Sequence, residues 1–553
     1  MGLVEQVQAT VRQTINFCAR EKFWLTCTAA IVLIWTVELY AVQARTLIYP
    51  NEVGARFAFW APKVRLVLDL LFISTLTVWF RPRWLCLIMV GSFFAYLGLV
   101  TYFQYFQRPI SLLTIFTNWR EGIEISGFAL DMFPKRAVVL LAAALVAQLT
   151  ALFLSRRVAL PRNCARLGAA TLAIGFLTLF VGLNFWDPLS FIQTKRGVGR
   201  LGAVRGYLGP WAAEWYYLRD SKVLGQALDL RKIKYDRLTP AEADIPIHKH
   251  LVIVQAESLD FNILGHMVDG VAVTPFLNRL RDISMFYRVR AMHYNVSADA
   301  DFVAMNGVSG SKHANTYMIP NYPYENTTPQ LLARCGFTVS SFHGYNGMFY
   351  RRRPAFEKMG FDQIYFREEL ERPPYNLRVD RWGVPDRDVL MLSALKMRGA
   401  KEPTCHFVIT LTTHTPYTML QASEREIYPN PTSTLEHYMN NMRYLDNCLR
   451  DYFTALGSGT TVMLYADHPT EQSCAGGDFA PDRSDGREYI PVFIYDTDQD
   501  LSKLQKTRKS PLRRDGSLNL VDMINYLRGQ VELAYGTDSA EAADRPQAAQ
   551  TPP

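Results

Sequence analysis

The chain is poor in charged residues, cysteine, glycine and proline for its length. Charged side chains make up 20% of its 553 residues, with 33 glycines and 29 prolines, which excludes collagen-like and wholly disordered chains. None of its eight cysteines form a Cys-x-x-Cys pair, and this argues against a zinc ribbon. Apolar residues reach 49% and aromatic residues 13%. The length and this composition exclude one compact soluble domain and are typical of membrane segments joined to a large folded domain.

The positive charge is confined to the first part of the chain. The whole chain carries +8, yet residues 1–220 hold 22 Lys and Arg against 11 Asp and Glu, which is +11 and leaves −3 for the remainder. A nucleic-acid-binding protein needs a basic patch on its folded domain. The charge distribution therefore disfavours nucleic-acid binding.

The cysteines fall into two groups. Four lie in or beside apolar segments and four are scattered through the second half: Cys18, Cys27, Cys86 and Cys164, then Cys335, Cys405, Cys448 and Cys474. If the second half lies outside the cytoplasm, one or two disulfides can form there, and buried free thiols fit equally well.

Five apolar runs approach the thickness of a bilayer. They are Phe23–Val42, Leu66–Phe80, Trp84–Phe106, Ala137–Leu154 and Leu167–Trp186, and we expect five membrane spans. The second run is short and carries Asp69, and only Arg81-Pro82-Arg83 separates it from the third, so these two form a tight hairpin. The first run lacks the small-residue cleavage site of a signal peptide and further spans follow it.

Basic residues in the short loops predict the orientation. They cluster before the first span, in the turn after the second and after the fourth: Arg12, Arg20 and Lys22; Arg81 and Arg83; Arg156, Arg157, Arg162 and Arg166. These sides are cytoplasmic by the positive-inside rule, so five spans place the second half outside. We expect a transmembrane domain over 1–186, a juxtamembrane linker with helices over 187–245, an extracytoplasmic domain over 246–535 and a disordered tail over 536–553. The loop 110–134 fits either interfacial helices or plain connectors.

The second half reads as an α/β domain. Short apolar runs bounded by polar turns predict buried strands of a mainly parallel sheet, namely LVIVQ, FTVSSF, HFVITLTT, TVMLYA and YIPVFIY. Helical periodicity in Pro275–Asp282, Thr328–Cys335 and His437–Leu456 places helices between them. We therefore expect a central sheet with helices on both faces.

Chemically active side chains follow four of these runs. Glu257 follows the first, His343 the second, His414 the third, and the pair Asp467-His468 the fourth. A single such residue is usually a cap or a packing residue. Because ligands bind beyond the carboxyl ends of parallel strands, four at one edge predict a metal or phosphate site.

Glu257, Asp467 and His468 form a ligand set that suits one Zn²⁺ or Mn²⁺ and leaves a position open. Ser297, in His293-Tyr-Asn-Val-Ser-Ala-Asp, reads as the first residue of a helix, where free N–H groups stabilise an anion. Beside a metal ion its hydroxyl can act as a nucleophile on phosphorus. Taken alone, the same residue also fits a simple helix cap.

Six segments carry a family resemblance in their order along the chain: VQAESLD, NVSADADF, SFHGYNGMFYRRRPAFEKMGFD, RWGVPD, LTTHTPYT and YADHP. With them the chain resembles the lipoteichoic acid synthase-like, phosphoglycerol transferase branch of the alkaline phosphatase and sulfatase superfamily. The resemblance implies five spans in a bacterial cytoplasmic (inner) membrane and an extracytoplasmic or periplasmic sulfatase-like domain. It also implies roles by position, with Glu257, Ser297, Asp467 and His468 holding the metal and His343, Arg352 and His414 surrounding a phosphorylated head group.

Three positions depart from the pattern of that branch. Ser297 replaces the usual threonine, Tyr350 stands for a tryptophan, and Ala466 replaces a glycine before the Asp-His pair. The first substitution keeps the hydroxyl, so the departures concern head-group identity more than reaction class. A true sulfatase also needs Pro and Arg after its nucleophile, and Ser297-Ala-Asp-Ala-Asp has neither, which disfavours sulfate-ester hydrolysis.

The resemblance implies a two-step transfer of phosphoglycerol from a phospholipid such as phosphatidylglycerol through Ser297 to an acceptor. His343 and His414 are candidates for proton transfer and for stabilising charge on the phosphoryl oxygens. Arg352 is a candidate for binding phosphate, although it also fits a solvated basic face. The acceptor can be a polyglycerolphosphate chain, another glycan or water. Phosphoethanolamine transfer to a surface glycan or lipid is the first alternative, and a non-enzymatic lipid sensor or regulator is the second.

Overall fold

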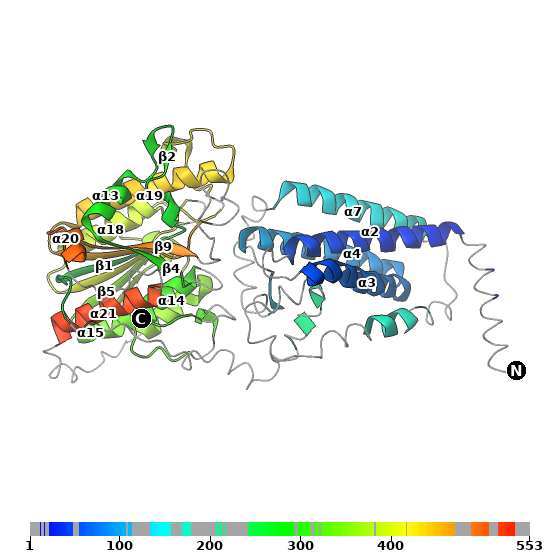
Figure 1. Cartoon of the computed structure of the whole chain (residues 1–553), viewed down its shortest axis with the longest axis horizontal. Coiled ribbons are helices and arrows are strands. Elements are labelled where there is room, and N and C mark those ends of the chain that lie inside the picture. The colour runs from blue at the N-terminus through cyan, green and yellow to red at the C-terminus, as the bar shows by residue number, and fades with distance from the viewer. Residues whose placement is uncertain are drawn as a thin grey trace. The chain divides into compact units, whose positions relative to one another are not determined.

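The computed structural model contains two compact units, Met1–Ala227 and Leu228–Pro553 (Figure 1). In the first unit it describes mainly residues 22–47, 55–106, 133–155 and 171–177, with a few others between 12 and 215. In the second it describes 242–292, 297–310, 316–319, 322–380, 383–415, 417–470, 488–507 and 518–536. Most of the loop 110–134, for which interfacial helices and plain connectors both stay open, lies outside the described residues, as do most of the linker and nearly all of the tail.

Four long helices make up the described core of the first unit: α2 (Lys22–Thr46), α3 (Ala55–Trp79), α4 (Pro82–Phe106) and α7 (Lys135–Ser155). Three described segments are long and apolar enough to cross a membrane, and they match the first, third and fourth predicted spans: Leu25–Thr46, Pro82–Phe103 and Lys135–Leu154. The second predicted span lies in α3 but is not among them, because Asp69 interrupts its apolar stretch and Lys63 and Arg65 directly precede it in the same helix. Most of the fifth lies outside the described residues.

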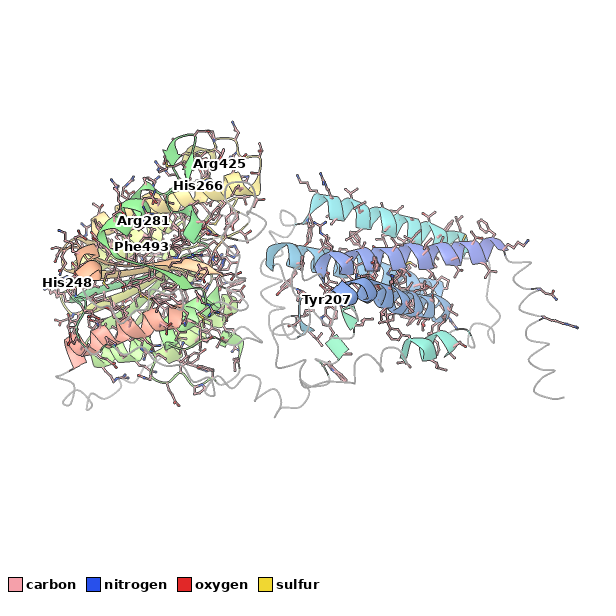
Figure 2. The ribbon with its side chains drawn as sticks, viewed as in Figure 1. Tyr207, His248, His266, Arg281, Arg425 and Phe493 are labelled. Carbon is pink, nitrogen blue, oxygen red and sulfur yellow. The ribbon has the colours of Figure 1, made fainter. Side chains whose placement is uncertain are left out.

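Polar side chains join these helices to one another. Gln148 Nε2 of α7 donates to Glu38 Oε2 of α2 at 2.6 Å, and Gln43 Nε2 of α2 donates to Asp69 Oδ1 of α3 at 3.0 Å. In hydrocarbon an unpaired polar group is costly, so such pairs favour helix association. Tyr207, labelled in Figure 2, is buried in the same unit.

A seven-stranded sheet forms the centre of the second unit, in the order β4-β9-β8-β1-β7-β5-β6. Its strands are β1 (His250–Ala256), β4 (Met285–Arg290), β5 (Thr338–His343), β6 (Gln363–Tyr365), β7 (Thr404–Ile409), β8 (Thr460–Ala466) and β9 (Tyr489–Asp496). The run β8-β1-β7-β5-β6 is parallel, whereas β9 pairs antiparallel with β8 and β4. The sheet is therefore mixed and mostly parallel, and it includes every strand predicted from the sequence.

Helices cover both faces of this sheet (Figure 1). One face carries α13 (Pro275–Ile283), α18 (Asp386–Gly399) and α19 (Thr434–Leu456), and the other carries α14 (Ala298–Asn306), α15 (Thr328–Arg334) and α21 (Leu520–Tyr535). All seven residues of β1 and of β8 are buried, as is Phe493 of β9 (Figure 2). Burial on both faces explains why these strands read as continuous apolar runs.

Smaller elements complete the unit: the hairpin β2 (Met267–Val268) and β3 (Val271–Ala272), and the short helices α16 (Arg352–Met359), α17 (Arg367–Leu370) and α20 (Ser502–Thr507). The three described cysteines of this unit, Cys335, Cys405 and Cys448, are free thiols. Burial raises the pKa of Cys448 to about 12, so this thiol is unreactive at neutral pH. Cys474 lies outside the described residues.

Candidate metal and phosphate site

The carboxyl ends of the parallel strands bring the predicted residues to one edge of the sheet. Ala256 at the end of β1 lies opposite Ala466 at the end of β8, and His343 at the end of β5 lies opposite Ile409 at the end of β7. The residues that follow these strand ends therefore emerge side by side. Strand register, rather than proximity in sequence, assembles the site.

Three potential metal ligands lie within 4.8 Å of one another: Glu257, Asp467 and His468. His468 Nε2 is 3.3 Å from Glu257 Oε1 and 3.4 Å from Asp467 Oδ2. Four ligands at about 2.0 Å around one tetrahedral ion are separated from each other by roughly 3.3 Å. The spacing of these atoms thus fits a single small divalent cation.

Hydrogen bonds orient each ligand so that one atom faces its neighbours. Asp467 Oδ1 accepts from the backbone N–H groups of Ser258 and His468 at 2.8 and 2.7 Å, whereas Asp467 Oδ2 is buried without a hydrogen-bond partner. His468 Nδ1 lies 2.8 Å from the carbonyl oxygen of Pro469. Nδ1–H therefore donates to that carbonyl, and Nε2 is left as the ligand atom. A buried carboxylate oxygen without a donor is the observation that best fits a metal here.

The electrostatics of the cluster also favour a cation. Burial raises the pKa of Asp467 well above its usual range, and the neighbouring Glu257 carboxylate raises it further. Two carboxylates held together away from water repel each other, and a divalent ion between them removes that repulsion.

Ser297 presents its hydroxyl to the same cluster. Its Oγ lies 3.3 Å from Glu257 Oε1 and 3.2 Å from His468 Nε2. Ser297 immediately precedes α14, but its side chain makes no capping hydrogen bond to that helix. The hydroxyl is thus directed toward the ligands, and a role as a simple helix cap does not describe it.

Arg352 and His343 form a second, fully internal part of the site. Arg352, the first residue of α16, is only 4% exposed, so it does not lie on a solvated basic face. Its Nη1 is 3.3 Å from His343 Nε2, and His343 Nδ1 is 3.2 Å from the carbonyl of Ile409. Nδ1–H therefore donates to Ile409, and Nε2 accepts from the guanidinium.

The imidazole of His343 is neutral in this environment. Burial lowers the pKa of His343 to about 3, and the adjacent charge of Arg352 lowers it in the same direction. Because its Nε2 lone pair already accepts from Arg352, His343 holds the arginine and has no free proton acceptor. This favours a positioning role for His343 over the proton-transfer role considered from the sequence.

His414 lies in the loop that follows β7. Its Nδ1 is 2.6 Å from the carbonyl of Thr415, so Nδ1–H donates to that carbonyl. Asp386 at the start of α18 holds the beginning of this loop by accepting from the backbone N–H groups of Leu411 and Thr412 at 2.7 and 2.9 Å. Asp386 stands in the RWGVPD segment, yet nothing in the sequence showed what its carboxylate contacts.

Left-handed backbone conformations gather around the site. Ser258 after β1 has φ 55°, Tyr350 and Arg351 directly before Arg352 have φ 54° and 57°, and Tyr417 has φ 63°. Residues with a Cβ rarely adopt this conformation, and it persists where surrounding contacts hold it. These positions direct Glu257, Arg352 and the His414 loop toward a common centre.

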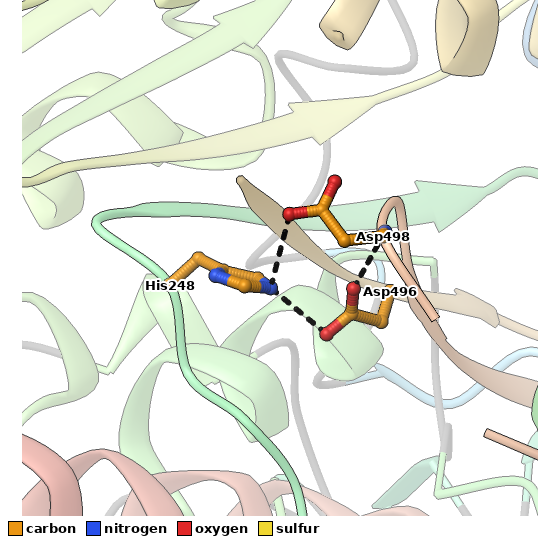
Figure 3. Close-up of side chains that lie close together, drawn as sticks. All are labelled: His248, Asp496 and Asp498. Atoms are coloured by element: carbon orange, nitrogen blue, oxygen red, sulfur yellow. Dashed lines mark hydrogen bonds and ion pairs between the residues drawn. The ribbon is translucent and has the colours of Figure 1, made fainter. Parts of the chain in front are cut away.

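A second group of potential ligands in the described part of the chain lies at the opposite edge of the sheet: His248, Asp496 and Asp498 (Figure 3). His248 Nε2 is 2.9 Å from Asp496 Oδ2 and 3.9 Å from Asp498 Oδ2. Asp496 Oδ1 already accepts from the N–H of Asp498 at 2.7 Å, and Asp498 is partly exposed. The contact between His248 and Asp496, together with the tight turn from Asp496 to Asp498, accounts for the proximity of these three side chains.

Comparison with known proteins agrees with this description. Residues 249–523 match the family model described as Sulfatase. The chain is 26% identical over 232 residues to the lipoteichoic acid synthase of Staphylococcus saprophyticus subsp. saprophyticus and 24% identical over 233 residues to lipoteichoic acid synthase 1 of Bacillus subtilis. Each match covers 40% of this chain and 36% of the relative, so it spans little more than a third of those proteins.

A solved structure resembles the chain over most of its length. It is that of the integral membrane protein lipooligosaccharide phosphoethanolamine transferase A from Neisseria meningitidis, with a TM-score of 0.54 and 13% identity, and it covers 92% of this chain and 95% of that one. At this identity the likeness concerns the fold alone. Through residues 249–523 the chain belongs to the sulfatase and alkaline phosphatase superfamily, and lipoteichoic acid synthases are among its distant homologues.

Proposed function

We propose that the chain is a membrane-anchored, metal-dependent phosphoglycerol transferase. It moves the head group of phosphatidylglycerol through a phospho-Ser297 intermediate to a glycan or polyglycerolphosphate acceptor outside the cytoplasm. The observation that carries this proposal is the Ser297 hydroxyl, directed at Glu257 and His468 and not at its own helix. The distant relatives named lipoteichoic acid synthase support phosphoglycerol transfer over transfer of another head group.

Glu257, Asp467 and His468, together with the Ser297 oxygen, would hold one Mn²⁺ or Zn²⁺. Such an ion, when bound, lowers the pKa of a neighbouring hydroxyl and stabilises negative charge on phosphoryl oxygens. Arg352 binds the remaining phosphoryl oxygens. His343 holds Arg352 in place through the contact at 3.3 Å.

The reaction proceeds by two displacements. In the first, Ser297 Oγ forms a bond to phosphorus, the bond from phosphorus to the diacylglycerol oxygen breaks, and the hydroxyl proton ends on the departing diacylglycerol. In the second, an acceptor hydroxyl attacks phosphorus, the Ser297–phosphorus bond breaks, and the acceptor proton returns to Ser297. His414, in the loop that follows β7 at this edge of the sheet, is the group that carries these protons.

The membrane unit fits a lipid donor. A site tethered beside a bilayer can reach a phospholipid head group without extracting the lipid, and no soluble donor is needed. We propose five spans in a bacterial cytoplasmic membrane, residues 1–186 as the membrane domain, 187–245 as the linker and 246–535 as the extracytoplasmic catalytic domain. The three apolar helices of the first unit support this arrangement.

The test is the intact mass of the full-length protein in lipid nanodiscs containing phosphatidylglycerol or phosphatidylethanolamine, with Mn²⁺ or Zn²⁺ added. Wild type and Ser297→Thr, which keeps a hydroxyl, are expected to gain the mass of phosphoglycerol and to release diacylglycerol. Ser297→Ala is the matched control and is expected to do neither.

Each other outcome selects a different function. An adduct of phosphoethanolamine mass that requires Ser297 would make the chain a phosphoethanolamine transferase. If neither lipid yields an adduct or diacylglycerol with either metal, the transferase proposal fails and a sensor or regulator role takes its place. An adduct retained by Ser297→Ala would show that another residue is the nucleophile.

A further inference from the structure

Asp301 is a buried carboxylate whose role the sequence did not predict. It lies on α14, four residues after Ser297, and it has no exposed surface. Its Oδ2 accepts a hydrogen bond from Arg352 Nε at 2.7 Å. Residues four apart lie on the same side of a helix, so the helix that begins at the nucleophile also carries the partner of the phosphate-binding arginine.

Asp301 and His343 together hold two sides of the Arg352 guanidinium. Arg352 Nε donates a hydrogen bond to Asp301 Oδ2, and Arg352 Nη1 lies 3.3 Å from His343 Nε2. Among the described residues Nη2 has no hydrogen-bond partner. The guanidinium is planar with donors in fixed directions, so fixing Nε and Nη1 also fixes where Nη2 points.

The backbone before Arg352 requires such a restraint. Tyr350 and Arg351 both adopt the left-handed conformation, which is unfavourable for residues with a Cβ. Arg352 therefore enters the interior from a strained turn. The described contacts of its charged group there are the hydrogen bonds with Asp301 and His343 and a cation–π contact with the Tyr350 ring at 5.8 Å. Because His343 is neutral, Asp301 supplies the negative charge that compensates the buried guanidinium.

We propose that Asp301 is a positioning residue that aligns Arg352 with Ser297, so that one phosphoryl group meets the serine hydroxyl and the arginine in a single geometry. The inference rests on the proposed transfer through Ser297 and adds the coupling between its nucleophile and its phosphate-binding residue. Without the carboxylate, the buried charge of the arginine has no compensation, and the guanidinium is held on one side alone, by His343. Affinity for phosphate should then fall even though every residue that contacts phosphate remains.

The experiment is a double-mutant cycle on phosphate binding. Inorganic phosphate is titrated calorimetrically into the Mn²⁺-loaded full-length protein in detergent, for wild type, Asp301→Asn, Arg352→Lys and the double variant. Loss of an aligned, charge-assisted hydrogen bond weakens binding by about 10-fold to 100-fold, and we expect this range for each single variant. Because both changes disrupt one unit, the double variant should bind no more than about 3-fold more weakly than Arg352→Lys.

Asp446 provides a matched control. It is also a buried carboxylate, but it accepts from the backbone N–H groups of Phe276 and Leu277 at the start of α13. Asp446→Asn is expected to leave phosphate affinity within about 2-fold of wild type, because it contacts neither Arg352 nor the ligand cluster. A general loss of stability would affect both aspartate variants alike, whereas the proposed role affects one.

Wild-type affinity in Asp301→Asn, or fully additive losses in the double variant, would overturn the inference. If Asp301→Asn does not fold, Asp301→Glu keeps the charge but displaces the carboxylate, and unchanged phosphate affinity in that variant would overturn it equally. The binding assay contains no lipid, so it is independent of the donor. Absence of a phospho-Ser297 adduct in wild type would refute the proposed function, and a wild-type rate of adduct formation in Asp301→Asn would refute only the coupling.

Discussion

Asp386 offers a direct test of how the His414 loop is held in place. Its carboxylate is 1% exposed and accepts from the backbone N–H groups of Leu411 and Thr412. In Asp386→Ala these two N–H groups lose their acceptor, and the loop that carries His414 loses its anchor. We therefore expect a large effect on catalysis and a small effect on stability.

The expected loss of stability follows from two opposing effects. Two buried N–H groups without an acceptor cost roughly 2–6 kcal/mol. Burial raises the pKa of Asp386 to about 6 from 3.8, so at pH 7 the folded protein bears an ionised carboxylate at a cost of about 3 kcal/mol, which the substitution removes. The free energy of unfolding should thus change by an amount between a gain of about 1 kcal/mol and a loss of about 3 kcal/mol.

Asp446→Ala is the control for this prediction. Asp446 also accepts two backbone N–H bonds, at 2.9 and 2.8 Å, and burial raises its pKa to about 6 as well. Both variants should show the same change in thermal unfolding by scanning fluorimetry. Diacylglycerol release from phosphatidylglycerol nanodiscs should fall more than about 10-fold in Asp386→Ala, as for other misaligned catalytic groups, and stay within about 2-fold of wild type in Asp446→Ala. Equal losses of activity would refute the reasoning, because they would trace both effects to stability.

Three further predictions concern pH, the metal and the membrane unit. Burial lowers the pKa of His406 to about 3, so the unfolded chain binds a proton at this residue more readily than the folded protein does. The free energy of unfolding therefore falls as the pH drops below about 6.5. From pH 7.5 to pH 5.5, the free energy of unfolding of His406→Gln should rise by about 1.4 kcal/mol relative to that of wild type. Mn²⁺ or Zn²⁺ at 100 times its dissociation constant should stabilise wild type by about 2.7 kcal/mol, and Asp467→Asn should abolish this gain in thermal unfolding. Glu38→Leu and Gln148→Leu should show a coupling of about 1 kcal/mol in a double-mutant cycle of unfolding in micelles.

Each of these has a clear contrary result. A stability difference between wild type and His406→Gln that does not change with pH would show that the imidazole is not held neutral. Equal stabilisation of Asp467→Asn by metal would place the ion elsewhere. Additive losses from the Glu38 and Gln148 variants would show that the hydrogen bond at 2.6 Å contributes nothing to helix association.

The sequence by itself determined which segments form the sheet and which residues follow the strand ends. Continuous apolar runs predicted β1, β5, β7, β8 and β9. A strand covered on both faces has no solvent-facing side that would carry polar residues, so its sequence is apolar throughout. The strands β4 and β6 were missed. β4 alternates buried and part-buried residues, and β6 has only three residues, so neither carries the apolar run that marks a covered strand.

Only the tertiary structure decided how the site is assembled. Register places Glu257 beside Asp467 although 210 positions separate them in the chain, and a left-handed turn carries Arg352 inward from a run of three arginines. The roles of Asp301 and Asp386 depend on contacts across 51 and 25 positions, and no local pattern encodes such contacts. Residue type and local periodicity are properties of a segment, whereas a partner across the fold is set by packing, which the sequence of one segment does not contain.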